Sequence, residues 1–443
     1  MKMETIIYKI RKLLQGYSPL ALVFLTAPFF LPVDKHLHRN ILLLFCAFPG
    51  ILLTLVNPSC WKRAGLIYIL LFVVFYEGQE LRGISHWTLS NVRMIGMQAL
   101  MILFPAIIIS HSTSNRRLYS VAICIILFIA VISSICSMVT YYSEAPFPEA
   151  RFEFTVRRSG NPIPDSWRSA FAAVLAGAFF IQTGPQLKRL DWFPLVCFPI
   201  LLLTAFYSHS RSTALALMAA LAVSILGVKK QIKKTLLLFA VTSAALLIYA
   251  GSLYFAPRQP GIVESASAPS LTLADSQEPT IFPTRSGGFL VAGEGGRIAA
   301  AGRLAIWRDH FSRMTSAKVW LVGHGLGKNC FVANMDSDAK SCYNVKDNVY
   351  QLHAHSGYIW ALYHGGLIGL GLLLVLICTA GWNALRGGYA GYVSGALVVF
   401  SGTILLVETQ RLLVGVGSLE YLIFWIPLAL AAGIPSRNQN SCT

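Results

Sequence analysis

The sequence predicts an all-α membrane protein with about twelve transmembrane helices and a large, partly helical periplasmic loop between helices 9 and 10. Three observations support this fold class. Of the 443 residues, 55% are hydrophobic and only 12% are charged, a balance that a soluble domain does not have. Apolar runs long enough to cross a bilayer recur along the chain. Lysines concentrate in alternate connections between these runs, as expected for a multi-pass protein.

Each apolar run of roughly 17 to 25 residues is interpreted as one helix, because backbone amides in lipid must be satisfied within the segment. The runs lie near residues 17–33, 40–57, 64–79, 93–110, 118–140, 167–184, 191–208, 211–228, 235–255, 356–381, 388–407 and 414–433. They divide the chain into helices 1–9 (residues 1–255), the loop (256–352) and helices 10–12 (353–443).

The lysines give the orientation of these helices. On one side of the predicted membrane lie Lys2, Lys9, Lys12, Lys62, Lys188, Lys229, Lys230, Lys233 and Lys234. By the positive-inside rule this side is cytoplasmic, so both termini are inside and segment 256–352 is outside. The formal net charge of +17 resides mostly in short loops, which favours anionic lipid and phosphate over nucleic acid as partners. No cleavable signal peptide is evident.

Arginine, in contrast to lysine, is abundant in the predicted outer connections. These arginines are Arg39, Arg82, Arg93, Arg151, Arg157, Arg158, Arg211 and Arg411. A guanidinium group grips phosphate with a planar fork of donors, so several of them could bind a phosphorylated ligand; the alternative is contact with lipid headgroups. Arg211 is the strongest candidate, since its connection is only a few residues long and holds the charge close to the hydrocarbon boundary.

The two longest predicted outer segments, 141–166 and 256–352, also carry candidate phosphate-binding arginines. Pro162 and Pro164 predict a stiff turn that holds Arg157 and Arg158. Segment 256–301 is rich in Ala, Gly, Ser and Pro, which indicates extended or partly mobile chain. From 303 to 315 the large apolar residues recur at steps of three or four, which predicts a helix that carries Arg303, and a second short helix is expected before Gly323.

His355 is the candidate catalytic residue, because it lies where the long polar segment re-enters the membrane and can meet both water and a lipid-borne substrate. An imidazole is largely neutral near pH 7 and can take a proton from a hydroxyl group. The alternative is a structural histidine at a helix start. His353 could orient His355 or the acceptor, whereas His324 and His364 are expected to be structural.

Metal and disulfide sites are less well supported. Asp336-Ser-Asp338 resembles the metal-binding triplet of nucleotide-sugar glycosyltransferases, but such triplets are common in solvated turns, so neither metal nor cofactor is expected. Cys330 and Cys342 share the large polar segment and could pair, although spacing alone does not bring two sulfurs together.

Four motifs together resemble the O-antigen ligase and O-antigen polymerase superfamily. They are Gly302-Arg303-x-x-Ile-Trp307, Gly323-His-Gly-Leu-Gly327, His355-Ser-x-Tyr-Ile-Trp360 and Gly365-Gly-Leu-Ile-Gly369. The ligase branch resembles the chain best, given its length, its single dominant loop and the histidine at the end of that loop. In many ligases the residue after the essential histidine is Asn, whereas here it is Ser356.

The resemblance implies an enzyme of the bacterial inner membrane with its active site facing the periplasm. Its donor would be a glycan on undecaprenyl diphosphate, and its acceptor the lipid A core oligosaccharide. Transfer would be metal-independent and inverting, with His355 as base. Diphosphate and acceptor would be bound by Arg211, Arg303, Arg157, Arg158, Arg82 and His353.

Other functions remain open on the sequence alone. A polymerase of the same superfamily would extend a chain of repeat units, and a protein O-oligosaccharyltransferase would use a protein acceptor. A transporter would more often show repeated halves and ionisable residues in mid-membrane. It is disfavoured here, because the apolar runs are nearly free of acidic residues and the polar segments concentrate on one face of the membrane.

Overall fold

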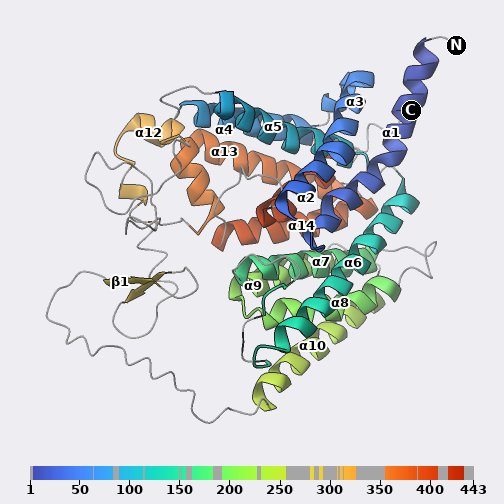
Figure 1. Cartoon of the computed structure of the whole chain (residues 1–443), viewed down its shortest axis with the longest axis vertical. Coiled ribbons are helices and arrows are strands. Elements are labelled where there is room, and N and C mark those ends of the chain that lie inside the picture. Colours follow the sequence, from blue (N-terminus) through green and yellow to red (C-terminus); the bar gives the residue numbers. More distant parts are fainter. Residues whose placement is uncertain are drawn as a thin grey trace.

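The computed structural model of the chain is a bundle of helices around a buried centre (Figure 1). It describes residues 3–62, 64–82, 89–112, 115–148, 150, 152–155, 162–182, 192–226, 231–255, 280–283, 289–292, 307, 310–312, 314–325, 355–386, 388–407 and 418–433. The α-helices are α1 (Met3–Thr26), α2 (Lys35–Leu42), α3 (Phe48–Val56), α4 (Ala64–Arg82), α5 (Leu89–Ile109), α6 (Arg116–Tyr142), α7 (Pro162–Gln182), α8 (Trp192–Tyr207), α9 (Arg211–Leu226), α10 (Ile232–Phe255), α12 (Ala317–Val322), α13 (Gly357–Arg386), α14 (Gly388–Val407) and α15 (Ile426–Ala432). Short 3-10 or π-helical segments are η1 (Ala27–Phe29), η2 (Leu43–Ala47), η3 (Pro58–Lys62) and η7 (Tyr421–Trp425).

Two short strands accompany the helices. β1 (Thr280–Pro283) and β2 (Phe289–Ala292) pair antiparallel, with Thr280 opposite Ala292 and Pro283 opposite Phe289. They lie within the stretch for which composition predicts extended chain, but their pairing is not predicted, because that prediction rests on small residues rather than on alternating apolar positions.

Within the described part of the chain, four helical segments are long and apolar enough to cross a membrane. They are Lys35–Val56, Arg116–Tyr142, Ile232–Phe255 and Gly357–Arg386. Shorter apolar helices are Gly65–Gln79, Ile95–Ile109, Trp192–Tyr207, Arg211–Ile225, Gly391–Val407 and Tyr421–Ala432. The chain is thus a multi-pass helical membrane protein, while the count of twelve helices and the periplasmic place of 256–352 stay predictions.

Small residues let α7 pack against α8, α9 and α14. Its fully buried alanines are Ala170, Ala172, Ala173, Ala176 and Ala178. A Cβ built on Gly177 would lie 3.1 Å from the side chain of Leu221 in α9 and 3.2 Å from Phe198 in α8. Lipid tails are as apolar as the helix surface, so the hydrophobic effect does not drive helices together in a membrane. Helices associate there by close packing of their backbones, which small residues allow.

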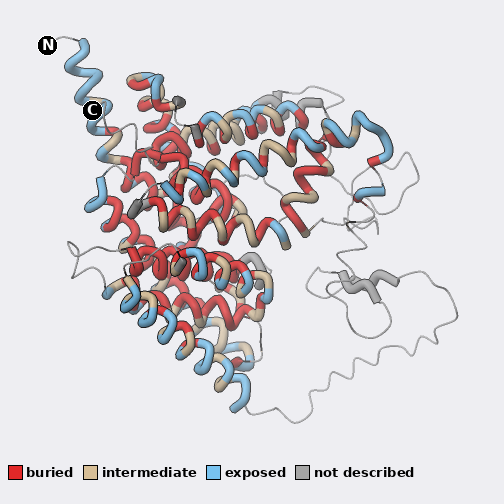
Figure 2. The backbone as a smooth tube through the Cα atoms, turned by 180° about the vertical axis from the view of Figure 1, so that it is seen from behind, coloured by how far each residue is buried: buried red, intermediate tan, exposed pale blue. Residues whose placement is uncertain are grey.

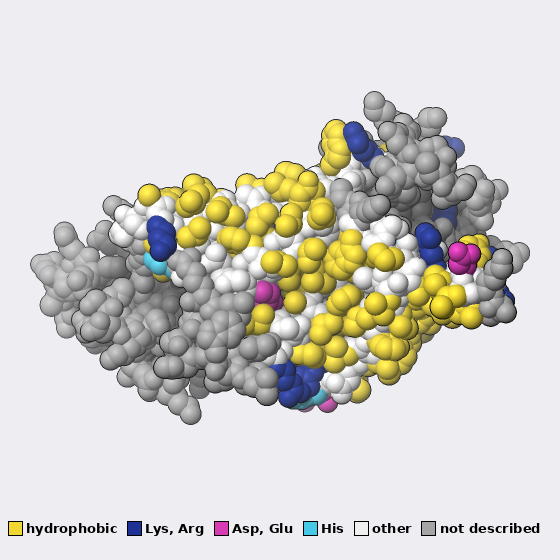
Figure 3. Space-filling model, turned by 90° about the horizontal axis from the view of Figure 1, so that it is seen from above, with side chains coloured by type: hydrophobic (Ala, Val, Ile, Leu, Met, Phe, Trp, Pro, Cys, Tyr) yellow, Lys and Arg dark blue, Asp and Glu magenta, His cyan; other side chains and the backbone are white. Residues whose placement is uncertain are grey.

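The outer helices carry the exposed apolar surface. Buried residues occupy the centre of the bundle and exposed ones its periphery (Figure 2). On α10 the exposed side chains include Leu247, Tyr254 and Phe255. In the view from above, hydrophobic side chains cover much of the middle of the face, and Lys and Arg lie toward its margins (Figure 3). This distribution suits a surface in contact with lipid.

α13 is divided by a sharp kink. Gly366 has φ 61° and ψ −160°, so residues 357–365 and 367–386 form two helical parts that run in different directions (Figure 1, orange). The prediction of one continuous helix over 356–381 is therefore wrong in this respect. The second part alone, at ~1.5 Å per residue, is about 30 Å long and suffices to cross the hydrocarbon core.

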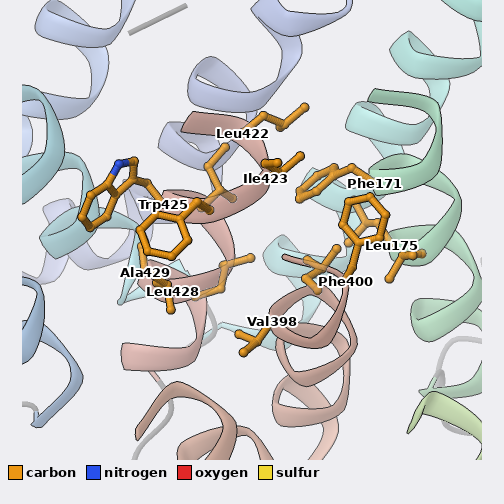
Figure 4. Packing of buried hydrophobic residues seen from close by; sticks show 14 of the residues in the cluster. Phe171, Leu175, Val398, Phe400, Leu422, Ile423, Trp425, Leu428 and Ala429 are labelled. Atoms are coloured by element: carbon orange, nitrogen blue, oxygen red, sulfur yellow. The ribbon is translucent and has the colours of Figure 1, made fainter. Parts of the chain in front are cut away.

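Several helix ends meet where α13 begins, at what we call the His355 end of the bundle. Tyr358 in the first turn of α13 donates a hydrogen bond of 3.2 Å to the carbonyl of Gly402 in α14. Phe400 of α14 lies beside Phe171, which is in the first half of α7 (Figure 4). The start of α7, the C-terminal part of α14 and the start of α13 are therefore at the same end.

The start of α9 lies at this end as well. The hydroxyl groups of Ser166 in α7 and Thr213 in α9 are 2.6 Å apart, so Arg211, the first residue of α9, lies at the His355 end. At the opposite end of α7, the ammonium group of Lys234 at the start of α10 donates to the carbonyl of Phe180 at 3.2 Å. Arg211, which is predicted to bind diphosphate, and Lys234, which is predicted to be cytoplasmic, thus lie at opposite ends of the bundle.

Candidate functional site

His355 is half-buried and occupies an unusual backbone conformation. Its φ is 47°, a left-handed value that residues other than glycine seldom adopt. The next residue, Ser356, caps α13: its carbonyl accepts from the amide of Trp360 at 2.9 Å, and its hydroxyl accepts from the amide of Ile359 at 3.4 Å. The chain therefore turns at His355 and enters the helix at once, which fixes the direction in which the imidazole leaves the backbone.

The helical part that follows is held by aromatic side chains. The hydroxyl group of Tyr76 in α4 donates to the carbonyl of Ala361 at 3.0 Å, and the Tyr76 ring stacks on Trp360 with centroids 5.2 Å apart. Gly365 and Gly369 leave room for Tyr76, because a Cβ on either would overlap its hydroxyl group. The start of α13 is thus fixed from the α4 side, in addition to its bond to α14.

The turn after α12 is bound to the same part of α13. The amide of His324 donates to the carbonyl of Tyr363 at 2.9 Å, and the amide of Gly325 donates to the carbonyl of His364 at 3.0 Å. Nδ1 of His364 lies 2.7 Å from the carbonyl of Gly325, and since a carbonyl only accepts, Nδ1 is the donor. His364 therefore has a structural role, and the turn after α12 is anchored beside the helix that His355 begins.

Arg211 is exposed at the first position of α9. Ser210 precedes it as the cap: its hydroxyl accepts from the amide of Thr213 at 3.3 Å, and its carbonyl accepts from the amide of Ala214 at 3.1 Å. The hydroxyls of Ser210 and Thr213 are also 2.8 Å apart. A cation at a helix N-terminus, where amide groups point outward, is a suitable arrangement for binding an anion.

A buried ion pair lies near the start of α7. Arg168 and Asp165 approach to 2.9 Å, with side chains only 3% and 0% exposed. The Arg168 guanidinium also lies over the ring of Phe154, 5.4 Å from its centroid. A buried charge is costly unless paired, so the two residues depend on each other for their place in the bundle.

A family model described as O-antigen ligase matches residues 196–374. Over these residues the chain is similar to the O-antigen ligase family. No curated protein sequence matches the chain. The matched region runs from α8 past the kink in α13 and includes Arg211, Arg303, His353 and His355. This similarity supports a glycan-transferring membrane enzyme of the ligase or polymerase type, with lipid-linked glycans as substrates.

The structure describes some of the predicted site residues and not others. His355 and Arg211 are described and share one end of the bundle. Arg82 ends α4, and Gln79 of the same helix lies against the Gly325 turn, so the backbone of Arg82 is at the His355 end too. The predicted residues outside the described part of the chain are Arg303, Arg157, Arg158, His353, Asp336, Asp338, Cys330 and Cys342.

The metal prediction can be compared only with the part of the chain that the structure describes. There, no three His, Cys, Asp or Glu side chains form a group that could hold a metal ion.

Sequence reasoning missed the Asp165–Arg168 pair. Both residues stand just before or within the first turn of the apolar run predicted from 167 to 184, and a scan for apolar runs assigns such residues to the connection. The available signal was their spacing, because residues three apart on a helix face each other.

Proposed function

We propose that the protein is an O-antigen ligase, which transfers a completed polysaccharide from undecaprenyl diphosphate to the lipid A core oligosaccharide at the periplasmic face of the bacterial inner membrane. One observation supports this above the others. The family match contains both His355 and Arg211, and helix packing puts these two residues at one end of the bundle. A catalytic base and a residue that binds the diphosphate must lie at the same end of the bundle to act in one reaction.

The base in this proposal is His355. Its imidazole takes the proton of an acceptor hydroxyl while the hydroxyl oxygen attacks the anomeric carbon of the donor sugar. The bond between that carbon and the diphosphate oxygen breaks, and its electron pair leaves with the diphosphate. Attack from the opposite face inverts the configuration at the anomeric carbon. His353 is proposed to orient His355 or the acceptor.

Arginines stabilise the leaving group in this mechanism. Arg211 and Arg303, with Arg157, Arg158 and Arg82, are proposed to hold the diphosphate, whose negative charge increases as the glycosidic bond breaks. Diphosphate is already a competent leaving group, so guanidinium groups fixed by the fold can serve where other transferases use a divalent cation. Transfer that continues unchanged in the presence of a chelator is expected, and loss of transfer that added Mg²⁺ restores would contradict a metal-independent reaction.

The orientation of the bundle follows from its lysines. Lys234 is at the end opposite His355, as described above, and α13 ends at Arg386, also away from His355. The positive-inside rule assigns the lysine-bearing end to the cytoplasm, which leaves the His355 end in the periplasm. Completed polysaccharides on a polyprenyl carrier are joined to lipid A core at that face, and the apolar helix surfaces give the polyprenyl chain a place in the membrane.

The test is a reconstituted reaction with the purified full-length protein and one donor, a glycan on undecaprenyl diphosphate. Three acceptors are compared: lipid A core, a second donor molecule and a protein acceptor. The proposal expects the mass of the lipid A core to increase by the glycan. Growth of the donor glycan instead would identify a polymerase, and modification of the protein would identify an O-oligosaccharyltransferase.

A further inference from the structure

The connection between α8 and α9 contains the second described non-glycine residue with positive φ, His209. Its φ is 52°, and its amide donates to the carbonyl of Phe206 at 2.8 Å. The chain reverses here between the end of α8 at Tyr207 and the start of α9 at Arg211. His209 thus lies in the turn just before Arg211, the residue predicted to bind diphosphate.

Both ring nitrogens of His209 have partners. Nε2 lies 3.1 Å from the carbonyl of Pro148, and Nδ1 lies 3.0 Å from the hydroxyl of Tyr249 in α10. Since a carbonyl only accepts, Nε2 carries the proton, and the neutral ring then accepts from the tyrosine hydroxyl at Nδ1. One half-buried imidazole therefore connects the α8–α9 turn to α10 and to the loop after α6.

That loop is itself fixed to the same turn. The amide of Phe152 donates to the carbonyl of Tyr207 at 2.9 Å, and the hydroxyl of Tyr142 donates to the carbonyl of Ala150 at 3.1 Å. Phe152, Phe154 and Tyr207 form a small buried cluster of their own, separate from the main core. His209 lies at the edge of this cluster and supplies its bond to Pro148.

We propose that His209 is a positioning residue for Arg211. Its imidazole holds the α8–α9 turn against Pro148 and Tyr249, and thereby sets the direction in which α9 presents the guanidinium of Arg211 to a diphosphate. Ser210 fixes the first turn of α9 through its bonds to the amides of Thr213 and Ala214. His209 fixes the preceding turn through its ring contacts with Pro148 and Tyr249. A planar bidentate grip depends on such alignment, because an exposed arginine otherwise samples many rotamers. The inference rests on the proposed role of Arg211 in binding the donor.

The test separates the imidazole from the backbone conformation. His209→Gly keeps a positive φ without strain and removes the ring, whereas His209→Asn tolerates the same φ and keeps a short polar group. Tyr249→Phe removes one hydrogen bond to the imidazole. Tyr207→Phe is the matched control, because it removes a 3.2 Å bond from α8 to Ser252 of α10 without affecting the histidine.

The measurements are the Kd of each purified variant for undecaprenyl diphosphate, the KM for lipid A core and the midpoint of thermal unfolding. We expect His209→Gly to raise the donor Kd about tenfold, His209→Asn less, and Tyr249→Phe about threefold. The control should leave the donor Kd unchanged, and the KM for lipid A core should not move in any variant. Equal donor affinity in wild type, Tyr249→Phe and His209→Asn overturns the proposal even if His209→Gly fails to fold.

A double-mutant cycle distinguishes positioning from a general structural effect. In an Arg211→Gln background, His209→Gly should cause no further loss of donor affinity, because the group that it positions is gone. Additive losses overturn the inference and leave the proposed function intact. If Arg211→Gln alone leaves the donor Kd unchanged, the role of Arg211 in the proposed function fails and the inference fails with it.

Discussion

The close approach of Gly366 in α13 to Leu321 in α12 predicts that alanine at Gly366 disrupts the packing of α12 against α13. Gly366 has φ 61° and ψ −160°, a region that is essentially restricted to glycine and costs other residues about 1–3 kcal/mol. A Cβ there would also overlap the carbonyl of Leu321, just as one on Gly323 would overlap the carbonyl of His364. Forcing extra volume into a packed contact costs about 1–3 kcal/mol more. The expected loss of stability is therefore about 2–6 kcal/mol.

The matched control is Gly371→Ala, in the second part of α13, where a Cβ meets nothing within 4 Å. Thermal unfolding of both purified variants and their turnover with donor and acceptor are measured in the same lipid environment. Gly366→Ala should unfold at a clearly lower temperature and lose transfer, because the contact lies next to the helix that His355 begins. Gly371→Ala should match wild type in both. Equal stability and turnover of the two variants would refute the argument.

Three further predictions concern single contacts. Tyr76→Phe removes the bond to Ala361 and should lower stability by about 1 kcal/mol, measured as the shift in thermal unfolding; an unchanged midpoint would contradict it. Asp165→Ala removes the ion-pair partner of the buried Arg168 and should cost about 3–5 kcal/mol, and a mild effect in an unfolding assay would show that the pair contributes little. Arg211→Lys should lower kcat/KM for the donor about tenfold or more, because an ammonium group cannot replace a bidentate fork; wild-type kinetics would remove Arg211 from the site.

Hydropathy predicted the helices well because lipid allows few alternatives. An apolar run in a membrane must satisfy its own backbone, so the run near 118–140 and the run near 235–255 became α6 and α10. The short helix expected before Gly323 is present as α12, and the described residues between 303 and 315 include helical ones at 307 and 310–312. In these places local pattern and final structure coincide.

The kink in α13 was not predictable from hydropathy, which carries no information on direction. Residues 356–381 form one apolar stretch whether or not the helix bends, and Gly365-Gly366 was the only local signal. The bend is required by packing instead, because α12 approaches the backbone of α13 at Gly366. Likewise, Asp165 and Arg168 can be buried because they pair with each other. A scan for apolar residues assigns both charged residues to a connection and so does not predict their burial.

The location of His355 and Arg211 on neighbouring helices at one end of the bundle also could not be predicted from the sequence. It depends on α14, which packs against both α13 and α9 and is bonded at Gly402 to the first turn of α13. The topology predicted from lysine positions put both residues on one side of the membrane, but it gave no reason for their helices to be neighbours. His209 was likewise visible only as part of a short connection, since its two partners come from distant parts of the chain.

The most direct test of the central claim is transfer by His355→Asn. Asparagine tolerates the positive φ at this position, so the turn into α13 is kept while the base is removed. Turnover of a lipid-linked glycan onto lipid A core and the Kd for undecaprenyl diphosphate are measured on the same preparation. A catalytic base predicts loss of turnover by at least about 100-fold with donor affinity close to wild type. Turnover near wild type in a folded His355→Asn protein would contradict a catalytic role for His355.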